Sequence, residues 1–544
     1  MNEKGYSLVF VLLTVTIFFI LGLTILSVSI YQAKFTQMRI EDVESLHEAV
    51  KAIEETIAEL KVKVENLDLS TPSQLDNDLG SAQSGFIKDL MDRHGVSIED
   101  MTKENKIERN KLFTRVYVIS KRYGNKTVSR QVIITNTPSF LKYAIGSRED
   151  VTLNGGSYID GNIYAEKNFY VTNVANYIYN SQKYSEPTSF PTTSETSVLF
   201  VGGNRYACNH ENGTKECYSI SPPEFNKNLL HFTINDTTLP FQYKGPLVQK
   251  EREEFIDVNF DFTFKDKLLS AAGIESFNPN PEIQTQYSSL IKLSIPDLLD
   301  ALKKSFTSIN NIQDLPTAID SGKSILLEGY ESPYLDLNNL TLNKNQWLII
   351  NGDVFLENSG TSQLQIKGNL LIYGNLYIRG NVAFDSTIYV SGNTSIYNST
   401  ISGLNNKEVV LLTKGELEIA RINEFQNNFS LTTPNLKGFF YTDSNAIIYA
   451  VGSYINIRGG LFARGTEQLI ANTDSTGLVI NAYRGATSDT GTNIAFTPPT
   501  LPEEQQAEQA RFVITHDKDV FINRGLGLPL VKKLALIVDK IEVK

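Results

Sequence analysis

Two cysteines have the spacing that most directly suggests chemistry in this chain of 544 residues. Cys208 and Cys217 flank the segment NHENGTKE, and the sequence contains no other cysteine. A pair this close in an exported protein favours one disulfide that closes a small loop. The alternatives are two free thiols, or a metal site with His210, but no further histidine or cysteine lies near enough to complete a ligand set. We therefore predict a Cys208–Cys217 disulfide and no bound metal.

Carboxylates that could form a catalytic pair are scattered through the second half of the chain. A polysaccharide hydrolase needs two carboxylates on one face, about 5–9 Å apart. Asp353, Glu357 and Asp385 are candidates, but we expect the repeat described below to place them on different coils. The sequence contains no Gly-x-Ser-x-Gly, Walker or His-Glu-x-x-His motif, and its five histidines are dispersed. We predict that the protein is not an enzyme and uses no cofactor.

The composition is typical of a β protein with many turns. Asparagine, glycine, serine and threonine are frequent beside β-branched residues, and there are 25 Tyr and 29 Phe. A hydrophobic content of 41% is too high for a disordered chain. A net charge of −11 argues against a general nucleic-acid or anionic-lipid surface, and we find no specific nucleic-acid signature.

An apolar run near the N-terminus has the length of a membrane span. No charged side chain occurs from Gly5 to Ala33. At about 1.5 Å per residue this run crosses a bilayer core of about 30 Å. It is longer than the apolar run of about 7–15 residues in a cleavable secretory signal, and no Ala-x-Ala-like site closes it. We predict a single transmembrane segment over 6–30, with the bulk of the chain extracellular.

Residues 1–5 form a short leader that ends in Lys4-Gly5 and is followed by Tyr6-Ser7-Leu8-Val9. This pattern resembles the class III leader of type IV prepilins. The resemblance implies cleavage between Gly5 and Tyr6 by a prepilin peptidase. It also implies a cell-surface filament with the apolar helix in its core, and other pilin-like subunits and the pilus assembly machinery as partners. The alternative is a membrane anchor that is never cut.

The fifth position of the expected mature chain departs from the pattern of major pilins. Major pilins carry glutamate there, whereas this sequence has Phe10. In the family, loss of this carboxylate is associated with large minor subunits near the filament tip, because the glutamate pairs with the N-terminus of the subunit already below. The resemblance therefore implies a minor pilin or pseudopilin-like subunit.

The helix is expected to continue through 31–67 with an apolar seam. Eight residues recur with spacings of three and four: Val43, Leu46, Val50, Ile53, Ile57, Leu60, Val64 and Leu67. Such a seam packs against the subunit's own globular domain, as in a pilin, or against other copies in a coiled coil. We predict a linker with short helices over 68–110, and then a β-hairpin over 111–137 that turns at Gly124-Asn125.

A hexad repeat dominates the second half of the chain. Apolar residues recur every six positions, with Gly-Asn at 368, 374, 380 and 392, as in Ile366, Ile372, Ile378, Phe384, Val390 and Ile396. Even positions should face inward and odd positions outward. Three hexads, about 18 residues, would form one coil of a parallel β-helix over 145–171 and 345–485. This pattern resembles the β-helical heads of minor pilin-like proteins and bactofilin-like polymers, and an antiparallel sandwich is the alternative.

The other segments complete the expected domain organisation. We predict an inserted domain with the cysteine loop over 172–344, including a helix over 295–309 capped by Ser294 or Asp297. The C-terminal segment 486–544 is expected to close the end of the β-helix. The predicted fold class is thus α+β, mainly β: a long N-terminal transmembrane and amphipathic helix, a β-hairpin, and a parallel β-helix with an inserted domain.

These features predict a subunit at or near the tip of a type IV pilus-like filament, acting in assembly priming or in adhesion to an unidentified surface ligand. Two other functions fit the same sequence. One is an uncleaved, membrane-anchored β-solenoid that serves as an adhesin or polymer. The other is a cell-surface enzyme that acts on polysaccharides.

Overall fold

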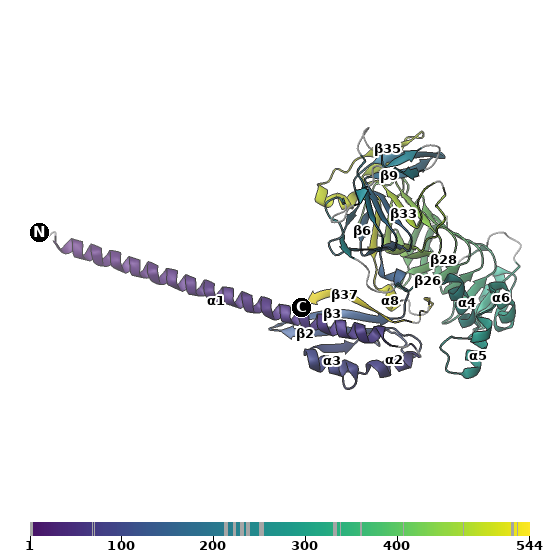
Figure 1. The fold of residues 1–544 in the computed structure, drawn as a ribbon, viewed down its shortest axis with the longest axis horizontal. Helices are drawn as coiled ribbons and strands as arrows, with labels where there is room; N and C mark the ends of the chain where they lie inside the picture. The colour runs from purple at the N-terminus through teal and green to yellow at the C-terminus, as the bar shows by residue number, and fades with distance from the viewer. Residues whose placement is uncertain are drawn as a thin grey trace. The chain divides into compact units, whose positions relative to one another are not determined.

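The computed structural model divides the chain into two compact units. Unit 1 is Met1–Thr135 with Lys533–Lys544, and unit 2 is Asn136–Lys532 (Figure 1). The structure describes residues 4–67, 69, 71–210, 216–220, 225–228, 233–234, 240–249, 255–329, 335–337, 339–358, 362–405, 407–471, 473–523, 527–529, 531 and 533–544. The first three residues of the predicted leader lie outside this set.

Unit 1 begins with one long helix, α1, over Lys4–Glu65. Its 62 residues contain no proline, and at about 1.5 Å per residue they extend over about 93 Å. The apolar seam is buried from Ala49 onward, through Ile53, Leu60 and Val64. Val43, which we expected in the seam, is instead 64% exposed. The seam packs on the subunit's own sheet, which supports the first of its two predicted arrangements.

The sheet of unit 1 is antiparallel with the order β1-β2-β3-β37. Its strands are β1 Ser97–Asp100, β2 Arg115–Tyr123, β3 Lys126–Thr135 and β37 Ala535–Val543. The predicted hairpin is present, since Tyr123 pairs with Lys126 across the Gly124-Asn125 turn. The predicted linker contains α2 Pro72–Leu79, α3 Phe86–His94 and also β1.

The C-terminal strand differs from our expectation. Residues 535–543 pair with β3 in unit 1 and do not close the end of the predicted β-helix. Alternating apolar residues identified this segment as a strand, but alternation does not specify a partner. The partner lies about four hundred residues earlier in the chain.

Most of unit 2 is a mainly parallel sheet of 27 strands among the described residues. Its strands form three ladders, and β26, β27, β30 and β32 each contribute to more than one of them. In spatial order, the first ladder is β18 Thr307–Ile309, β19 Ile325–Leu327, β22 Trp347–Ile350, β25 Asn369–Ile372, β26 Leu376–Val390, β28 Val409–Thr413, β30 Leu436–Thr442, β32 Ile455–Ala463, β4 Ile145–Ser147, β7 Ile163–Ala165, β12 Val198–Val201 and β17 Leu247–Gln249. The second is β20 Leu335–Asp336, β23 Val354–Asn358, β26, β27 Thr394–Gly403, β29 Leu417–Ala420, β31 Ala446–Ala450, β33 Leu478–Ala482, β5 Val151–Gly155, β8 Phe169–Thr172 and β13 Arg205–Cys208. The third is β21 Leu340–Thr341, β24 Leu364–Lys367, β26, β27, β30, β32, β36 Phe512–His516, β6 Tyr158–Asp160 and β11 Thr192–Thr193.

The predicted inward-facing residues of the hexad repeat are buried. At most 1% of each side chain is exposed for Ile366, Leu370, Ile372, Leu376, Ile378, Val382, Phe384, Ile388, Val390 and Ile396. In all three ladders the paired residues are 18 positions apart at this point: Leu364 with Val382, Leu370 with Ile388, and Leu376 with Thr394. These aliphatic side chains belong to one continuous core that runs through unit 2.

The Gly-Asn pairs have two separate roles in the ladders. A Cβ atom on Gly374 would lie 2.3 Å from the carbonyl oxygen of Gly352, so a side chain does not fit there. The next residue supplies a side-chain link: Asn375 N donates to Asp353 Oδ1 at 2.7 Å, and Asn393 N donates to Asn375 Oδ1 at 2.8 Å. Glycine therefore permits the close approach of the backbones, and asparagine satisfies the exposed N–H groups at the strand ends.

The chain enters the ladders in the middle and not at an end. β4 pairs with β32 on one side and with β7 on the other. The strands that follow β4 build one half of the ladders, and those from β18 to β36 build the other half. Much of the predicted inserted domain, 172–344, therefore lies within the ladders themselves.

A helical segment connects the two halves. It contains α4 Phe260–Ala271, α5 Pro281–Leu290 and α6 Ile295–Leu302, and α7 Leu315–Asp320 follows β18. Ser294 caps α6 by accepting a hydrogen bond from Asp297 N at 3.3 Å. The predicted helix over 295–309 is too long, because its last residues form β18. The other elements are β9 Val174–Tyr179, β10 Gln182–Pro187, β14 Tyr218–Ile220, β15 Phe225–Lys227, β16 Thr233–Ile234, β34 Ala486–Asp489, β35 Ile494–Thr497 and α8 Val520–Asn523, with short 3-10 turns at Ser139–Lys142, Lys303–Ser305, Ile312–Asp314 and Glu503–Gln509.

The junction between the two halves is held by residues just before α4. The carboxylate of Asp257 accepts hydrogen bonds from Arg148, which follows β4, at 2.5 Å, and from Arg464, which follows β32, at 3.0 Å. The ring of Phe255 stacks on Tyr164 of β7 and Phe462 of β32, with centroid distances of 4.7 and 5.5 Å. The connecting segment thus contacts strands of both halves, β32 on one side of the junction and β4 and β7 on the other.

We predict that Leu376→Asp strongly destabilises unit 2. The side chain is fully buried among aliphatic residues, so an unpaired carboxylate there costs several kcal/mol. Tyr377→Asp is the matched control. Tyr377 is only partly buried, and losing its ring contact with Phe355 should cost at most about 1.5 kcal/mol. Thermal unfolding of the full chain in detergent measures both, and a larger effect at Tyr377 would contradict the inside-outside assignment.

Candidate functional site

The first part of α1 exposes an apolar surface that no described part of the chain covers. Leu8 is 70% exposed and Phe10 is 72% exposed, and large apolar side chains continue in this state as far as Val43. The helix is long and apolar enough to cross a membrane. Hydroxyl groups in this stretch bond within the helix; for example, Thr14 Oγ1 donates to the carbonyl of Phe10 at 2.7 Å. Its polar groups are therefore compatible with an apolar environment.

Charged side chains mark the change from the exposed to the packed part of α1. The first after the apolar run is Lys34, and acidic residues dominate from Glu41. Asp42 forms an ion pair with Lys126 of β3 at 3.3 Å, and burial of the helix against the sheet begins at Ala49. The helix thus has an uncovered apolar part, a charged middle part and a part that belongs to the subunit core.

The predicted processing residues lie at the very start of this helix. The backbone of Gly5 and Tyr6 is helical, and the structure describes nothing further of their side chains. Phe10 follows one helical turn later and is exposed. The three residues that the pilin resemblance singles out therefore lie in the first two turns of α1.

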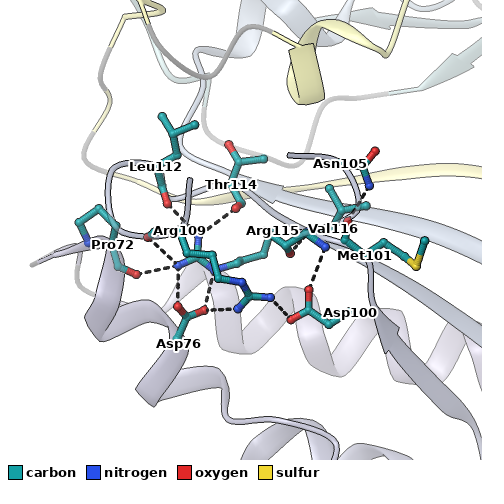
Figure 2. Close-up of polar contacts among 11 residues, drawn as sticks. Pro72, Asp76, Asp100, Met101, Asn105, Arg109, Leu112, Thr114, Arg115 and Val116 are labelled. Atoms are coloured by element: carbon teal, nitrogen blue, oxygen red, sulfur yellow. Dashed lines mark hydrogen bonds and ion pairs between the residues drawn. The ribbon is translucent and has the colours of Figure 1, made fainter. Parts of the chain in front are cut away.

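A buried arginine fastens the segment after α1 to the sheet (Figure 2). The Arg115 side chain is fully buried at the start of β2. Its Nε and Nη2 atoms donate to the two carboxylate oxygens of Asp76 in α2, at 2.6 and 2.9 Å. Nη1 donates to the carbonyl oxygens of Leu112 and Thr114 at 2.7 and 2.9 Å, and Nη2 also donates to that of Pro72 at 2.8 Å. One side chain therefore satisfies backbone groups from two segments, the start of α2 and the residues just before β2.

A second arginine extends this network to β1. Arg109 donates to Asp76 at 2.9 Å and to the carboxylate of Asp100, as Figure 2 shows. Burial opposes ionisation of Asp100, but hydrogen bonds from Thr102 and Arg109 outweigh it and lower the pKa of Asp100 below its ordinary value. The two arginines and two carboxylates join α2, β1 and β2 into the surface beneath α1.

The sequence analysis missed this network. Arg115 lies in the predicted hairpin 111–137, where the period of two of a strand places it on the opposite face from Val116. In the structure Arg115, Val116 and Tyr117 are all buried, because β2 is covered on both faces. Asp76 lies in α2 and Asp100 ends β1, and their distance from Arg115 along the chain gives no signal of a contact.

A disulfide joins Cys208 and Cys217, whose Cα atoms lie 5.8 Å apart. The sulfur atoms pack with Val174, Tyr218 and Phe225 in a small buried cluster beside the sheet. The backbone N–H of His210 donates to Asn173 Oδ1 at 2.6 Å. Within the part of the chain that the structure describes, no group of three or more His, Cys, Asp or Glu residues is arranged to hold a metal ion.

The candidate catalytic carboxylates all have structural partners. Asp353 accepts the Asn375 hydrogen bonds of the ladder, Glu357 pairs with Arg379 at 3.4 Å, and Asp385 lies 3.8 Å from Lys407. Asp353 directly precedes β23 and Glu357 lies near its end, so our expectation that these two belong to different coils was wrong. Their interactions are those of charged side chains on the surface of a sheet.

Comparisons with known proteins give limited guidance. No protein-family model matches the chain, and no curated protein matches it. Among solved structures it is similar to the competence-associated pilin ComZ from Thermus thermophilus, with 12% identity over 79% of this chain and 81% of that chain, at a TM-score of 0.28. A score this low supports no inference by itself. The long N-terminal helix, however, is typical of type IV pilins, and it packs on an antiparallel sheet. Unit 1 thus has the long helix packed on its own sheet that the resemblance in the sequence implies.

We predict that Arg115→Ala destabilises unit 1 by about 2–3 kcal/mol, because it removes one of the two arginines that pair with Asp76 and leaves several carbonyl groups without their donor. Arg122→Ala is the matched control on the same strand, where the side chain is exposed, and should change stability by less than about 0.5 kcal/mol. Hydrogen exchange of the β2 amides during denaturant unfolding measures both. Equal effects of the two substitutions would contradict the role of the network.

Proposed function

We propose that this protein is a minor subunit of a type IV pilus-like filament. The observation that supports this proposal is the division of α1 into an uncovered apolar part and a part packed in the subunit core. An apolar helix surface of this length needs a bilayer or other helices to cover it. A subunit that is first held in the membrane and then packs its helix among those of other subunits provides both environments in turn.

Cleavage after Gly5 by a prepilin peptidase would begin this sequence of events. The segment Lys4-Gly5-Tyr6 precedes the uncovered part of α1 directly, so the cut would leave the whole apolar surface on the mature chain. The partners are then other pilin-like subunits and the assembly machinery. The subunit would lie in the cell membrane before assembly and in a cell-surface filament afterwards.

A position at or near the filament tip follows from Phe10. In the pilin pattern the carboxylate at this position pairs with the N-terminus of the subunit already in place, and phenylalanine cannot form this ion pair. A subunit that cannot form this ion pair is disfavoured at positions where its helix must pack beside the N-terminus of a subunit already in place. We therefore propose that it primes assembly and is present in few copies.

The large unit 2 would form the exposed head, and we propose that its strands wind a parallel β-helix. Three observations support this architecture: three ladders, parallel pairing along them, and an offset of 18 residues in all three ladders. A head at the tip is placed to contact surfaces, so adhesion to a surface ligand is the second role that we propose.

Processing at Gly5 is the direct test of this proposal. When the chain is expressed with a prepilin peptidase, the product should begin at Tyr6, and Gly5→Val should block cleavage. Gly22→Val is the matched control: a side chain at Gly22 meets no atom within 4 Å, so cleavage should be normal. N-terminal sequencing and intact mass measure the product. A native protein that still begins at Met1 would indicate the uncleaved anchor instead.

We predict that the native filament contains few copies of this subunit relative to its major pilin, and that deletion lowers the number of filaments. Phe10→Glu should raise the copy number, because it restores the carboxylate that positions within the filament require. Phe18→Glu is the control, as it adds the same charge to the same exposed apolar surface at another position. Quantitative mass spectrometry of sheared filaments measures the copy number of the wild type, Phe10→Glu and Phe18→Glu, and electron microscopy counts the filaments after deletion. Wild-type abundance equal to that of the major pilin would contradict the tip position.

A further inference from the structure

Unit 2 is inserted into unit 1 at two neighbouring points of one sheet. The chain leaves unit 1 at Thr135, the end of β3, and returns at Lys533, just before β37. Thr135 pairs with Ala535, so the outgoing and returning segments lie side by side in the sheet of unit 1. All of residues 136–532 lie between these two points in the sequence.

The folded insert also holds its own two ends together. At its first residue, the buried side chain of Asn136 donates from Nδ2 to the backbone oxygen of Val531 at 3.3 Å. Val531 is itself buried in the same unit. Once unit 2 has folded, the ends that must enter β3 and β37 are therefore already adjacent.

This adjacency removes an entropic obstacle to completing unit 1. If residues 136–532 were unfolded, pairing β3 with β37 would close a loop of that whole length, and the entropy lost on closure increases with loop length. A folded insert with joined ends has already undergone that loss. Non-local strand pairing is intrinsically late in folding for the same reason.

Unit 1 depends on β37 for more than an extra strand. Ala535 and Leu536 of β37 are buried, and α1 contacts this strand. Arg130 of β3 donates to the backbone oxygen of Asp539 at 2.7 Å, and its guanidinium also contacts the carboxylate of Glu54 in α1. Without β37, strand β3 would be an open edge and this three-part contact would be incomplete.

We propose that β37 is a folding latch, which closes the pilin-like unit only after residues 136–532 have folded. A chain whose insert is truncated or misfolded would then present an open sheet beneath α1. This order of folding concerns a single chain and holds whether or not the protein is a filament subunit. Its consequence, that only subunits with a finished head are competent for assembly, rests on the function proposed above.

Hydrogen exchange of the wild-type full chain in detergent, at increasing denaturant concentration, tests the latch first. The amides of β3 should lose their protection at a denaturant concentration no higher than that at which β26 in unit 2 loses its own. If the β3 amides stay protected after β26 has unfolded, the proposal is overturned. Cleavage at Gly5 is measured separately, so failure of the latch and failure of the pilin function are distinguishable.

A cross-link between β3 and β37 tests why β3 loses its protection when the insert is unfolded. If the cause is the lost pairing with β37, a covalent link between the two strands should restore the protection. Leu376→Asp should unfold unit 2 and remove protection from β3, whereas Tyr377→Asp should leave both protected. If β26 remains protected in the Leu376→Asp chain, unit 2 has not unfolded, and the double variant Leu376→Asp with Ile378→Asp is used in its place. Ser129 and Glu542 are paired across β3 and β37. In the Leu376→Asp chain, a disulfide made by Ser129→Cys with Glu542→Cys should restore β3 protection. Protection without the cross-link, or no protection with it, overturns the proposal.

Discussion

The pairing of β3 with β37 is the contact on which the organisation of this molecule depends. It joins residues about four hundred positions apart, and it brings the long helix, the hairpin and the last strand together in one compact unit. Unit 2, which contains most of the residues, lies between the two strands in the sequence. Because both connections leave from the same point of the sheet, an insert of any size can be accommodated, provided that its own ends meet. The Asn136–Val531 hydrogen bond shows how this insert satisfies that condition.

A second constraint acts inside the insert, where each strand must accept the backbone of the next at about 4.8 Å. At the corner near Gly374 this spacing leaves no room for a Cβ atom, and the adjacent asparagine replaces the missing backbone partner with its side-chain oxygen. These two requirements are local, so they recur in the sequence with the period of the ladder. This explains why the hexad analysis correctly predicted the inward positions, including Leu376 and Ile378, from the sequence alone.

Features that depend on distant partners could not be predicted in the same way. The alternation in residues 535–543 indicated a strand but not its pairing with β3, and nothing near Arg115 in the sequence indicated Asp76. The N-terminal helix, the hairpin turn at Gly124-Asn125 and the disulfide depend on neighbours within a few residues, and the sequence was sufficient for each of them. The order of strands along the ladders, with β4 beside β32, depends on the fold as a whole.

One signal in the sequence did indicate that a face of the sheet is covered, although the period of two does not use it. Strands of the first ladder contain continuous apolar runs, such as Ile325–Leu327, Trp347–Ile350 and Val409–Leu412, which is typical of strands covered on both faces. Their outward residues, including Leu371, Tyr389 and Phe462, are buried. Phe140, Phe255 and Phe260 lie against this outward face. A chain that enters its ladders in the middle must later cross from one end to the other. The apolar outer face of the first ladder gives that crossing segment a surface on which to pack.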